Sequence, residues 1–361
     1  MTELYLVRHA EAEGNLYRRA QGWYDSLITP RGYRQLAALR ERFAEVPLEA
    51  VYSSDLFRTQ TTARALYEPK HLPLRVLPWL REIGIGVWED VPWALLAFRY
   101  AEQLRCFNMD LSRWTLEGAE TGEAVQKRML AAVKLLAMSH PDAAIAAVSH
   151  GSAIRLLLAA VEGLPLSEIG KAPHSDNTAV SLLEIEGDAI RVVYRDDASH
   201  LEKDESLSTL RRQSWWKKAD GIELGIWYAP AEPGAAYLSL LERSAVPVTA
   251  EEANAFFAQD SEALWQVMQG DTPVGALVLD TRRGILRQEG WVAGLGLLPA
   301  LRGHGYGEQL LGQAIAVYRP QGRQSLCFAQ SEDLRGFWEQ CGCVCDGGIA
   351  RLDIGYHLRA F

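Results

Sequence analysis

The sequence predicts an α/β protein whose first half forms a mainly parallel sheet. Short apolar runs alternate with amphipathic helical segments through residues 1–200, and polar side chains follow directly after several of these runs. Parallel strands joined by helices make right-handed crossovers, so their carboxyl ends meet at one edge of the sheet. The chain has 361 residues, which is more than one core readily supports, and this length indicates two domains.

The apolar and helical patterns define the elements of the first half in order. Thr29-Pro30 supplies an N-cap hydroxyl and a first-turn proline for one helix, and Ser53, Ser54 and Asp55 are candidate caps for the next. Strands are predicted at residues 4–7, 50–54, 74–77, 143–148, 179–185 and 190–194, and helices from residue 29 onward and at 57–66, 121–138 and 152–161.

Composition limits the classes of function. The net charge of -9 and the pI near 5.5 argue against a nucleic-acid partner or an anionic membrane surface. The chain shows neither a signal-peptide pattern nor an apolar run of about 20 residues, so we expect a cytoplasmic protein. The five cysteines, three of them at Cys341, Cys343 and Cys345, do not have the spacing of a disulfide framework or of a metal site. We therefore expect reduced thiols and no bound metal.

Five polar residues are expected to share one crevice at the carboxyl edge of the sheet. Arg8 and His9 follow the first strand and His150 follows a buried strand, while Arg58 lies in the first turn of a helix and Glu82 follows the third strand. Guanidinium groups bind phosphoryl oxygens in pairs of hydrogen bonds, so a phosphorylated small molecule is the expected guest. One of the two histidines can attack phosphorus, and by position Glu82 suits the exchange of a proton with the leaving oxygen.

These residues, taken in order, resemble the histidine phosphatase superfamily, which has the phosphoglycerate mutase-like fold. The resemblance covers roughly residues 1 to 200 and implies a three-layer α/β/α domain. It implies that His9 is phosphorylated during turnover and that Glu82 is the proton donor. Arg8, Arg58 and His150 would then hold the phosphate. The matching motifs are Arg8-His9-Ala10-Glu11 with Asn15, the segment 53–62 around Arg58, Leu80-Arg-Glu82-Ile, and Val148-Ser-His150-Gly.

Three further residues near the first motif resemble additional phosphate contacts, namely Asn15, Gln21 and Gly22. Asn177 is expected to tie a late strand to the pocket. An ordinary role in loop structure is the alternative for Asn15, Gln21 and Asn177.

The resemblance leaves open whether the pocket serves a phosphatase or a mutase. Mutases of the family carry a longer basic insertion after the acid. Here Glu82 is followed by Gly84, Trp88-Glu89 and Trp93, which is similar to the small phosphatase branch that includes the α-ribazole phosphatase group. We therefore favour hydrolysis of phosphomonoesters without a metal.

The charged stretch between Arg195 and Asp220 indicates a connection, and we expect the boundary near Ser208, giving domains 1–208 and 209–361. The aromatic pairs Trp215-Trp216 and Trp227-Tyr228 are expected to be core residues, with docking of the two halves as the alternative.

The informative stretch of the second half joins a predicted strand, 291–297, to a predicted helix, 310–318. Glycines between a strand and a helix leave backbone N–H groups free at the positive end of the helix, which suits a pyrophosphate. Seven residues of this stretch are the expected cofactor contacts: Leu297, Arg302, Gly303, His304, Gly305, Tyr306 and Gly307.

This stretch resembles the Gcn5-related N-acetyltransferase (GNAT) family, whose Arg or Gln, two residues, Gly, one residue, Gly or Ala pattern binds acetyl-CoA. The resemblance covers roughly residues 222 to 361 and implies an α+β fold, with strands at 273–279 and 325–329 and a helix at 331–342. Trp338 stands where the family often has a tyrosine, and Glu289 precedes the position of a general base. His304 and Cys341 are alternatives for proton transfer.

The sequence thus predicts a phosphatase domain fused to an acetyl-CoA-dependent N-acetyltransferase whose amine acceptor is unknown. One alternative is a phosphatase whose C-terminal domain only senses acyl-CoA. Another is a phosphomutase.

Overall fold

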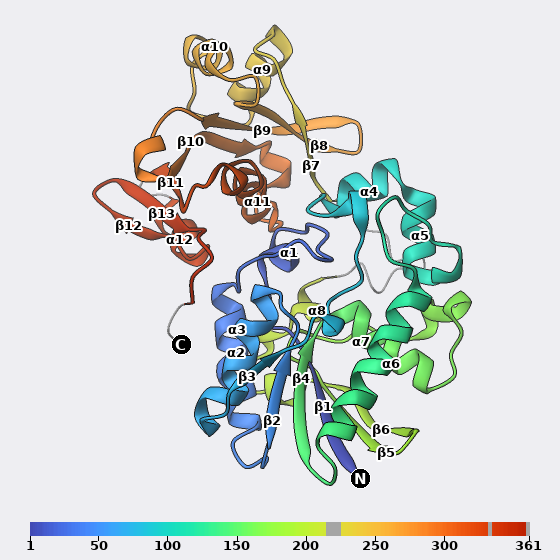
Figure 1. Ribbon diagram of the computed structural model, residues 1–361. Coiled ribbons are helices and arrows are strands. Elements are labelled where there is room, and N and C mark those ends of the chain that lie inside the picture. Colours follow the sequence, from blue (N-terminus) through green and yellow to red (C-terminus); the bar gives the residue numbers. More distant parts are fainter. Residues whose placement is uncertain (214–224, 331–333, 359–361) are drawn as a thin grey trace.

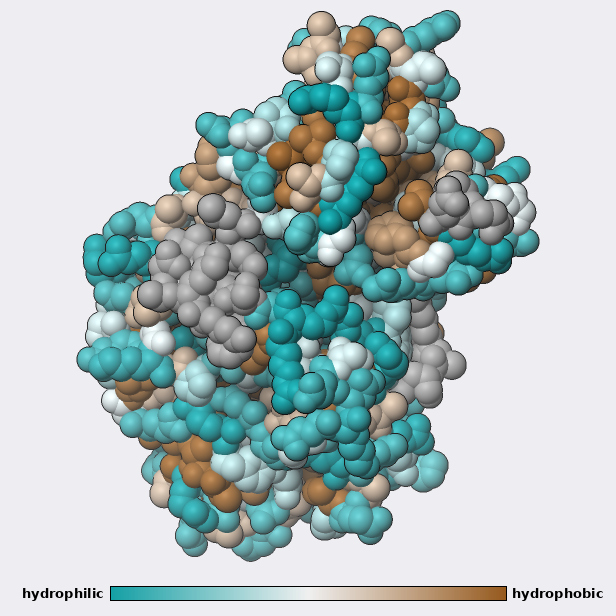
Figure 2. Space-filling view, turned by 180° about the vertical axis from the view of Figure 1, so that it is seen from behind, coloured by the Kyte–Doolittle hydropathy of each residue, from teal (hydrophilic) through white to brown (hydrophobic). Residues whose placement is uncertain are grey.

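A computed structural model gives the fold and describes residues 1–213, 225–330 and 334–358. The chain forms two lobes, with the N-terminal half in one and the C-terminal half in the other (Figure 1). From behind, hydrophilic side chains cover most of the lower lobe, interrupted by small hydrophobic patches (Figure 2). Within the described ranges, no helix combines the length and the apolar character needed to cross a membrane.

The N-terminal lobe is built on a mainly parallel sheet of six strands, as predicted, in the order β3-β2-β4-β1-β5-β6. The first four strands are parallel to one another, whereas β5 is antiparallel to β1 and to β6. The last pair is antiparallel because only Gly187 and Asp188 join β5 to β6, and so short a turn makes a hairpin. The strands are β1 (Thr2–Arg8), β2 (Ala50–Ser53), β3 (Leu74–Val76), β4 (Ala144–Ser149), β5 (Val180–Glu186) and β6 (Ala189–Asp197).

Helices cover both faces of this sheet and complete the three layers (Figure 1). One core joins the sheet to α2 and α3, and the other joins it to α6 and α7. The helices are α1 (Glu13–Leu16), α2 (Pro30–Arg42), α3 (Phe57–Tyr67), α4 (Trp93–Arg99), α5 (Ala101–Met109), α6 (Gly122–Ser139), α7 (Gly151–Val161) and α8 (Thr209–Arg212).

The N-termini of α2 and α3 are capped in different ways. At α2 the prediction is confirmed, because the Thr29 hydroxyl accepts the Gly32 N–H and Pro30 occupies the first turn. At α3 the predicted serine and aspartate caps are wrong, since the N-cap is Leu56 without a side-chain hydrogen bond. The Phe57 N–H instead donates a hydrogen bond of 2.5 Å to Oδ2 of Asp25, a residue on a loop that is distant in sequence.

The C-terminal lobe is an α+β domain on a sheet of seven strands in the order β12-β13-β11-β10-β9-β8-β7. Within the described part of this second sheet, β10 and β11 are parallel neighbours and the other neighbouring pairs are antiparallel. Helices α9 and α10 pack on one face, and α11 and α12 on the other. The elements are β7 (Trp227–Pro230), α9 (Ala235–Arg243), α10 (Ala250–Gln259), β8 (Leu264–Gln269), β9 (Thr272–Asp280), β10 (Glu289–Leu297), α11 (Tyr306–Tyr318), β11 (Ser325–Ala329), α12 (Arg335–Gln340), β12 (Val344–Asp346) and β13 (Ile349–Asp353).

The two lobes are joined by side chains that cross the boundary. Tyr17 of the first lobe is buried in the core of the second, and a Cβ added to Gly312 would lie 2.5 Å from the Tyr17 Cβ. Trp227 on β7 stacks on Phe98 of α4 with ring centroids 5.5 Å apart. Docking, the alternative considered for Trp227, is therefore observed. Trp215-Trp216 lies outside the described residues, as does the start of the helix predicted at 331–342.

The segment after the expected boundary stays with the first lobe. The backbone N–H groups of Thr209 and Leu210 donate to Asp176 Oδ1, at 2.8 Å and 3.3 Å. The Gln35 amide donates to the Leu207 carbonyl and the Thr209 hydroxyl. These contacts hold Thr209 and Leu210 against the first lobe, and the boundary near Ser208 stays a prediction.

We expect replacement of Arg319 by methionine to destabilise the protein by about 3–5 kcal/mol, because it leaves the buried Glu13 carboxylate without its cation. In the native chain Arg319 Nη2 lies 2.8 Å from Glu13 Oε1, and the two side chains are only 9% and 11% exposed. Thermal and denaturant unfolding would measure the loss. The matched control is Arg335→Met, which breaks an exposed pair with Glu339 and should cost no more than about 1 kcal/mol. Equal losses of unfolding free energy in the two variants would show that the Arg319–Glu13 pair stabilises the protein no more than an exposed pair does.

Candidate active site

The ends of three parallel strands bring the predicted residues together. Arg8 at the end of β1 is in register with Ser149 at the end of β4, and Ser53 at the end of β2 is in register with Val148. His9 and His150 are the residues that follow β1 and β4, and their ring centroids are 5.3 Å apart. The crevice expected at this edge of the sheet is therefore present.

His9 is buried and its tautomer is fixed by its own loop. Nδ1 lies 2.8 Å from the Ala10 carbonyl, which can only accept a hydrogen bond, so Nδ1 carries the hydrogen. The pKa of His9 is lowered well below its usual value by burial and by the charges of Arg58 and Arg8. A neutral ring with Nδ1 protonated has its lone pair on Nε2, the state that a nucleophilic histidine needs.

His150 is held by a chain of hydroxyl groups. Its Nε2 lies 2.8 Å from Ser54 Oγ, which lies 2.7 Å from Thr59 Oγ1, and the Thr59 hydroxyl donates to the Leu56 carbonyl at 2.8 Å. Burial and the nearby Arg58 lower the pKa of His150 well below its usual value. Ser54, a candidate helix cap in the sequence, is thus a partner of the second histidine instead.

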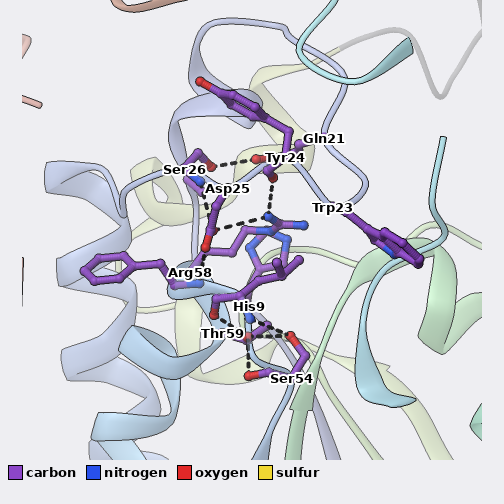
Figure 3. Close-up of polar contacts among 12 residues, drawn as sticks. His9, Gln21, Trp23, Tyr24, Asp25, Ser26, Ser54, Arg58 and Thr59 are labelled. Carbon is purple, nitrogen blue, oxygen red and sulfur yellow. Dashed lines mark hydrogen bonds and ion pairs between the residues drawn. The ribbon is translucent and has the colours of Figure 1, made fainter. Parts of the chain in front are cut away.

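Arg58 is fully buried under the loop of residues 21–26 (Figure 3). Nη1 donates to the Tyr24 carbonyl at 2.8 Å and Nη2 to the Gly22 carbonyl at 2.7 Å. Asp25 Oδ1 lies 3.6 Å from Nη1 and supplies a counter-charge. The loop therefore fixes both ends of the guanidinium fork.

Three buried nitrogen atoms around His9 have no hydrogen-bond partner among the described residues. They are Arg8 Nε, Arg58 Nε and His150 Nδ1, and each comes from a different strand end or helix start. Leaving a buried donor unpaired costs about 1–3 kcal/mol, so such a group is rare and calls for an explanation. Two guanidinium N–H groups and one imidazole nitrogen beside a neutral histidine suit an anion with several oxygens.

Glu82 lies at the start of α7, where it accepts backbone N–H groups. Oε2 accepts from Ser152 at 3.0 Å, and Oε1 accepts from Ala153 at 2.8 Å and from Ile83 at 2.9 Å. Its own carbonyl accepts from Trp23 Nε1 and Arg128 Nη2, both at 2.9 Å. These five hydrogen bonds, three to the carboxylate and two to the backbone carbonyl, hold Glu82 in the wall of the cavity.

A cavity of about 160 Å³ opens over these groups. Arg8, His9 and Glu82 line it, whereas Arg58 and His150 are completely buried behind it. Asn15 and Gln21 also line the cavity. Gly22 does not, and contributes its carbonyl to Arg58. Asn177 donates to the His9 carbonyl at 2.9 Å, which ties the start of β5 to the site as expected.

The remaining walls of the cavity were not found from the sequence. The aromatic and aliphatic part includes Trp93, Leu104 and Phe107 from α4 and α5, whose segment shows no clear periodicity. The basic part includes Arg18 and Arg155. No single-residue signal marks these positions, because they face the site only once the helices are packed.

The buried histidines predict a loss of stability in acid. The pKa values of His9 and His150 are lowered, and that of His174 is lowered to about 3 by burial and by Arg155 and Arg8. Below a pH of about 6.5 these histidines bind protons in the unfolded chain but stay neutral in the native protein. Each of them therefore lowers the free energy of unfolding by about 1.4 kcal/mol for every pH unit of further acidification. We expect the melting temperature to fall as the pH decreases from 7 to 5. His174→Gln should flatten this dependence, and an unchanged slope in that variant would contradict the assignment.

The glycine-rich stretch forms a loop at the start of α11. Gly303 and Gly305 have φ angles of 77° and 78°, and an added Cβ at either would meet no atom within 4 Å. Arg302 braces the loop from behind, because Nε donates to the Leu297 carbonyl at 3.0 Å and Nη2 to the Ser244 carbonyl at 3.2 Å. Of the predicted contacts, His304, Gly305 and Tyr306 line a second cavity of about 190 Å³. Gly303, Gly307, Leu297 and Arg302 do not line it.

The groups considered for proton transfer in the second lobe are mostly engaged elsewhere. Trp338 is 3% exposed and stacks on Phe328 with ring centroids 4.4 Å apart. Glu289 forms an ion pair with Arg351 at 2.6 Å. Burial raises the pKa of the Cys341 thiol, so it stays protonated. Within the described ranges, no group of three or more His, Cys, Asp or Glu side chains could hold a metal ion.

Comparison with known proteins finds two family matches. The model of the histidine phosphatase superfamily (branch 1) matches residues 4–198, and that of the acetyltransferase (GNAT) family matches residues 228–343. Two domains of these families are therefore present in one chain.

Individual relatives match the first lobe. Phosphoserine phosphatase 1 of Hydrogenobacter thermophilus is 29% identical over 186 residues, covering 52% of this chain and 88% of that protein. The probable phosphoglycerate mutase GpmB of Proteus mirabilis is 34% identical over 169 residues, covering 46% of this chain and 77% of that protein. Bacillus stearothermophilus YhfR, a solved structure, is 31% identical with a TM-score of 0.54, covering 56% of this chain and all of that one.

Proposed function

Because this chain belongs to the histidine phosphatase superfamily (branch 1), we propose that its first lobe hydrolyses phosphomonoesters through a phosphohistidine formed at His9. The observation that carries the proposal is the set of three buried nitrogens around the neutral His9 ring, one each from Arg8, Arg58 and His150, that have no partner in the part of the chain that the structure describes. They offer a phosphoryl group its hydrogen bonds beside the nitrogen that would attack it.

The reaction would proceed in two steps. In the first, His9 Nε2 forms a bond to phosphorus while the bond from phosphorus to the ester oxygen breaks, and Glu82 gives that oxygen a proton. In the second, water attacks phosphorus, Glu82 takes a proton from the water, and the phosphorus–nitrogen bond breaks. Arg8, Arg58 and His150 would stabilise the charge on the equatorial oxygens in both steps.

A mutase remains the alternative, since some of the relatives are named as probable phosphoglycerate mutases. A screen of cellular phosphate esters in ¹⁸O-labelled water separates the two. A phosphatase releases inorganic phosphate that carries one ¹⁸O atom from the water that cleaves phosphohistidine. A mutase returns a positional isomer of the substrate with little label in free phosphate.

For the second lobe we propose acetyl-CoA-dependent acetylation of an amine. The GNAT match and the open space around Gly303 and Gly305 at the start of α11 support it. The alternative is an acyl-CoA sensor that adjusts the phosphatase. Two observations favour that alternative: Trp338 is buried, and the cavity at this loop shares residues with the phosphatase cavity. Calorimetric binding of acetyl-CoA together with transfer to a panel of amines would decide, because robust transfer excludes a pure sensor.

A further inference from the structure

The second cavity lies between the two lobes. One wall is the loop at the start of α11, with His304, Gly305 and Tyr306. The opposite wall comes from the first lobe and includes Arg18 and Arg31. Figure 1 shows α1, which ends two residues before Arg18, lying between the lobes close to α11. The loop predicted to bind a coenzyme is exposed, and the cavity that it lines is completed by residues of the histidine phosphatase domain.

The charges in this cavity favour an anion. Arg18, Arg31 and Arg212 line it together with the carboxyl groups of Glu11 and Glu308. Glu11 is already compensated, since Arg31 Nη1 lies 2.8 Å from its Oε2. Burial raises the pKa of Glu308, which weakens its negative charge. Arg31 Nε is buried without a partner among the described residues. With the Arg31–Glu11 pair counted as neutral, Arg18 and Arg212 face Glu308 alone, so positive charge exceeds negative charge among the residues that line the cavity.

Arg18 is placed where the two cavities meet. Its Nη1 donates to Gln213 Oε1 at 3.2 Å, and both residues line both cavities. Its backbone has a φ of 56°, in the region that non-glycine residues seldom adopt, and its carbonyl accepts the Trp93 N–H at 2.9 Å. The five residues common to the two cavities are Asn15, Arg18, Trp93, Thr209 and Gln213.

We propose that the pyrophosphate of acyl-CoA binds in the cavity between the lobes, held by the loop at Gly305 on one side and by the guanidinium groups of Arg18 and Arg31 on the other. The proposal rests on the acyl-CoA binding proposed for the second lobe. It adds that the site is shared, so that the histidine phosphatase domain supplies part of the coenzyme site. Arginine suits this role because its planar fork binds two phosphate oxygens at once, opposite the positive end of α11.

The test is calorimetric binding of acetyl-CoA to the full chain and to variants of the first lobe. Arg18→Asn removes the guanidinium, and asparagine tolerates a positive φ. We expect Kd to rise about tenfold in this variant, the loss of one charge-assisted hydrogen bond. Arg18→Lys keeps the charge and should retain most of the affinity. Arg40→Gln, an exposed arginine at the far end of α2, is the matched control and should bind as the wild type does.

A second variant tests the same site without changing Arg18, so that an effect of Arg18→Asn on the local backbone cannot account for both results. The double replacement Glu11→Gln with Arg31→Gln removes both members of the ion pair, so no lone buried charge remains, and it should also weaken binding by about tenfold. If wild type binds acetyl-CoA and both variants bind equally well, the shared site is overturned while coenzyme binding by the second lobe stands. If wild type does not bind acetyl-CoA, the function proposed for the second lobe fails and the shared site fails with it.

Discussion

Replacement of His9 by alanine is expected to lower kcat for the proposed phosphomonoester hydrolysis on the order of 10⁴-fold or more, because it removes the nitrogen that would form the covalent intermediate. His9 Nε2 is the free ring nitrogen, since Nδ1 is bound to the Ala10 carbonyl. His150 cannot replace it, because its Nε2 is 2.8 Å from Ser54 Oγ and the ring is fully buried behind the cavity. The effect should be on kcat rather than on folding.

Two measurements check this result. An alkaline detergent quench of wild-type turnover with a ³²P-labelled ester should trap a base-stable label that is lost on later exposure to acid, and the label should be absent from His9→Ala. His71→Asn is the control: His71 is exposed, has a φ of 54° that asparagine tolerates, and lies outside the cavity. Retention of wild-type kcat by His9→Ala, or a label on the wild type that resists acid, would rule out the phosphohistidine.

Replacement of Glu82 by glutamine is expected to lower kcat by about 10²–10⁴-fold for esters of alcohols, the usual contribution of a positioned acid–base group. The loss should be much smaller for an aryl ester, because a good leaving group needs no proton. The amide oxygen can keep the Ala153 and Ile83 N–H groups or the Ser152 N–H, and the amide nitrogen then faces the other donor, so the aryl ester also reports any shift of the side chain.

The measurement compares an alkyl and an aryl phosphate in the same variants. Glu123→Gln, an exposed carboxylate in the first turn of α6, is the matched control and should leave both rates unchanged. An equal loss of kcat for the two esters would show that Glu82 acts on structure or on phosphate binding and not as the proton donor.

The sequence predicts well those residues that stand beside regular elements. Arg8, His9 and His150 follow apolar runs whose strand character is plain, and a parallel sheet brings strand ends together whatever the loops do. The same reasoning found the glycines that open α11. Periodicity and glycine content are local properties of the sequence, so they can be interpreted without knowing how the elements pack.

Long-range partners were not predictable in the same way. Asp25 and Tyr24 lie on a loop without periodicity, yet they bind the start of α3 and the Arg58 guanidinium. Ser54 looks like a helix cap in sequence, but its hydroxyl is used by His150. The position of Arg18 between two cavities depends on how the lobes dock. Each of these contacts joins segments whose proximity is decided by tertiary packing, on which a single sequence carries little information.

The contact between Tyr17 and Gly312 also limits how the molecule can move during turnover. Tyr17 and the carbonyl partners of Arg58, Gly22 and Tyr24, lie on one short stretch of chain. A hinge rotation that separated the lobes would expose the Tyr17 ring to water and pull on the stretch that holds Arg58. Substrate entry and product release should therefore depend on local motions of the side chains around the cavity, and a ligand of the second lobe should bind without the two lobes separating.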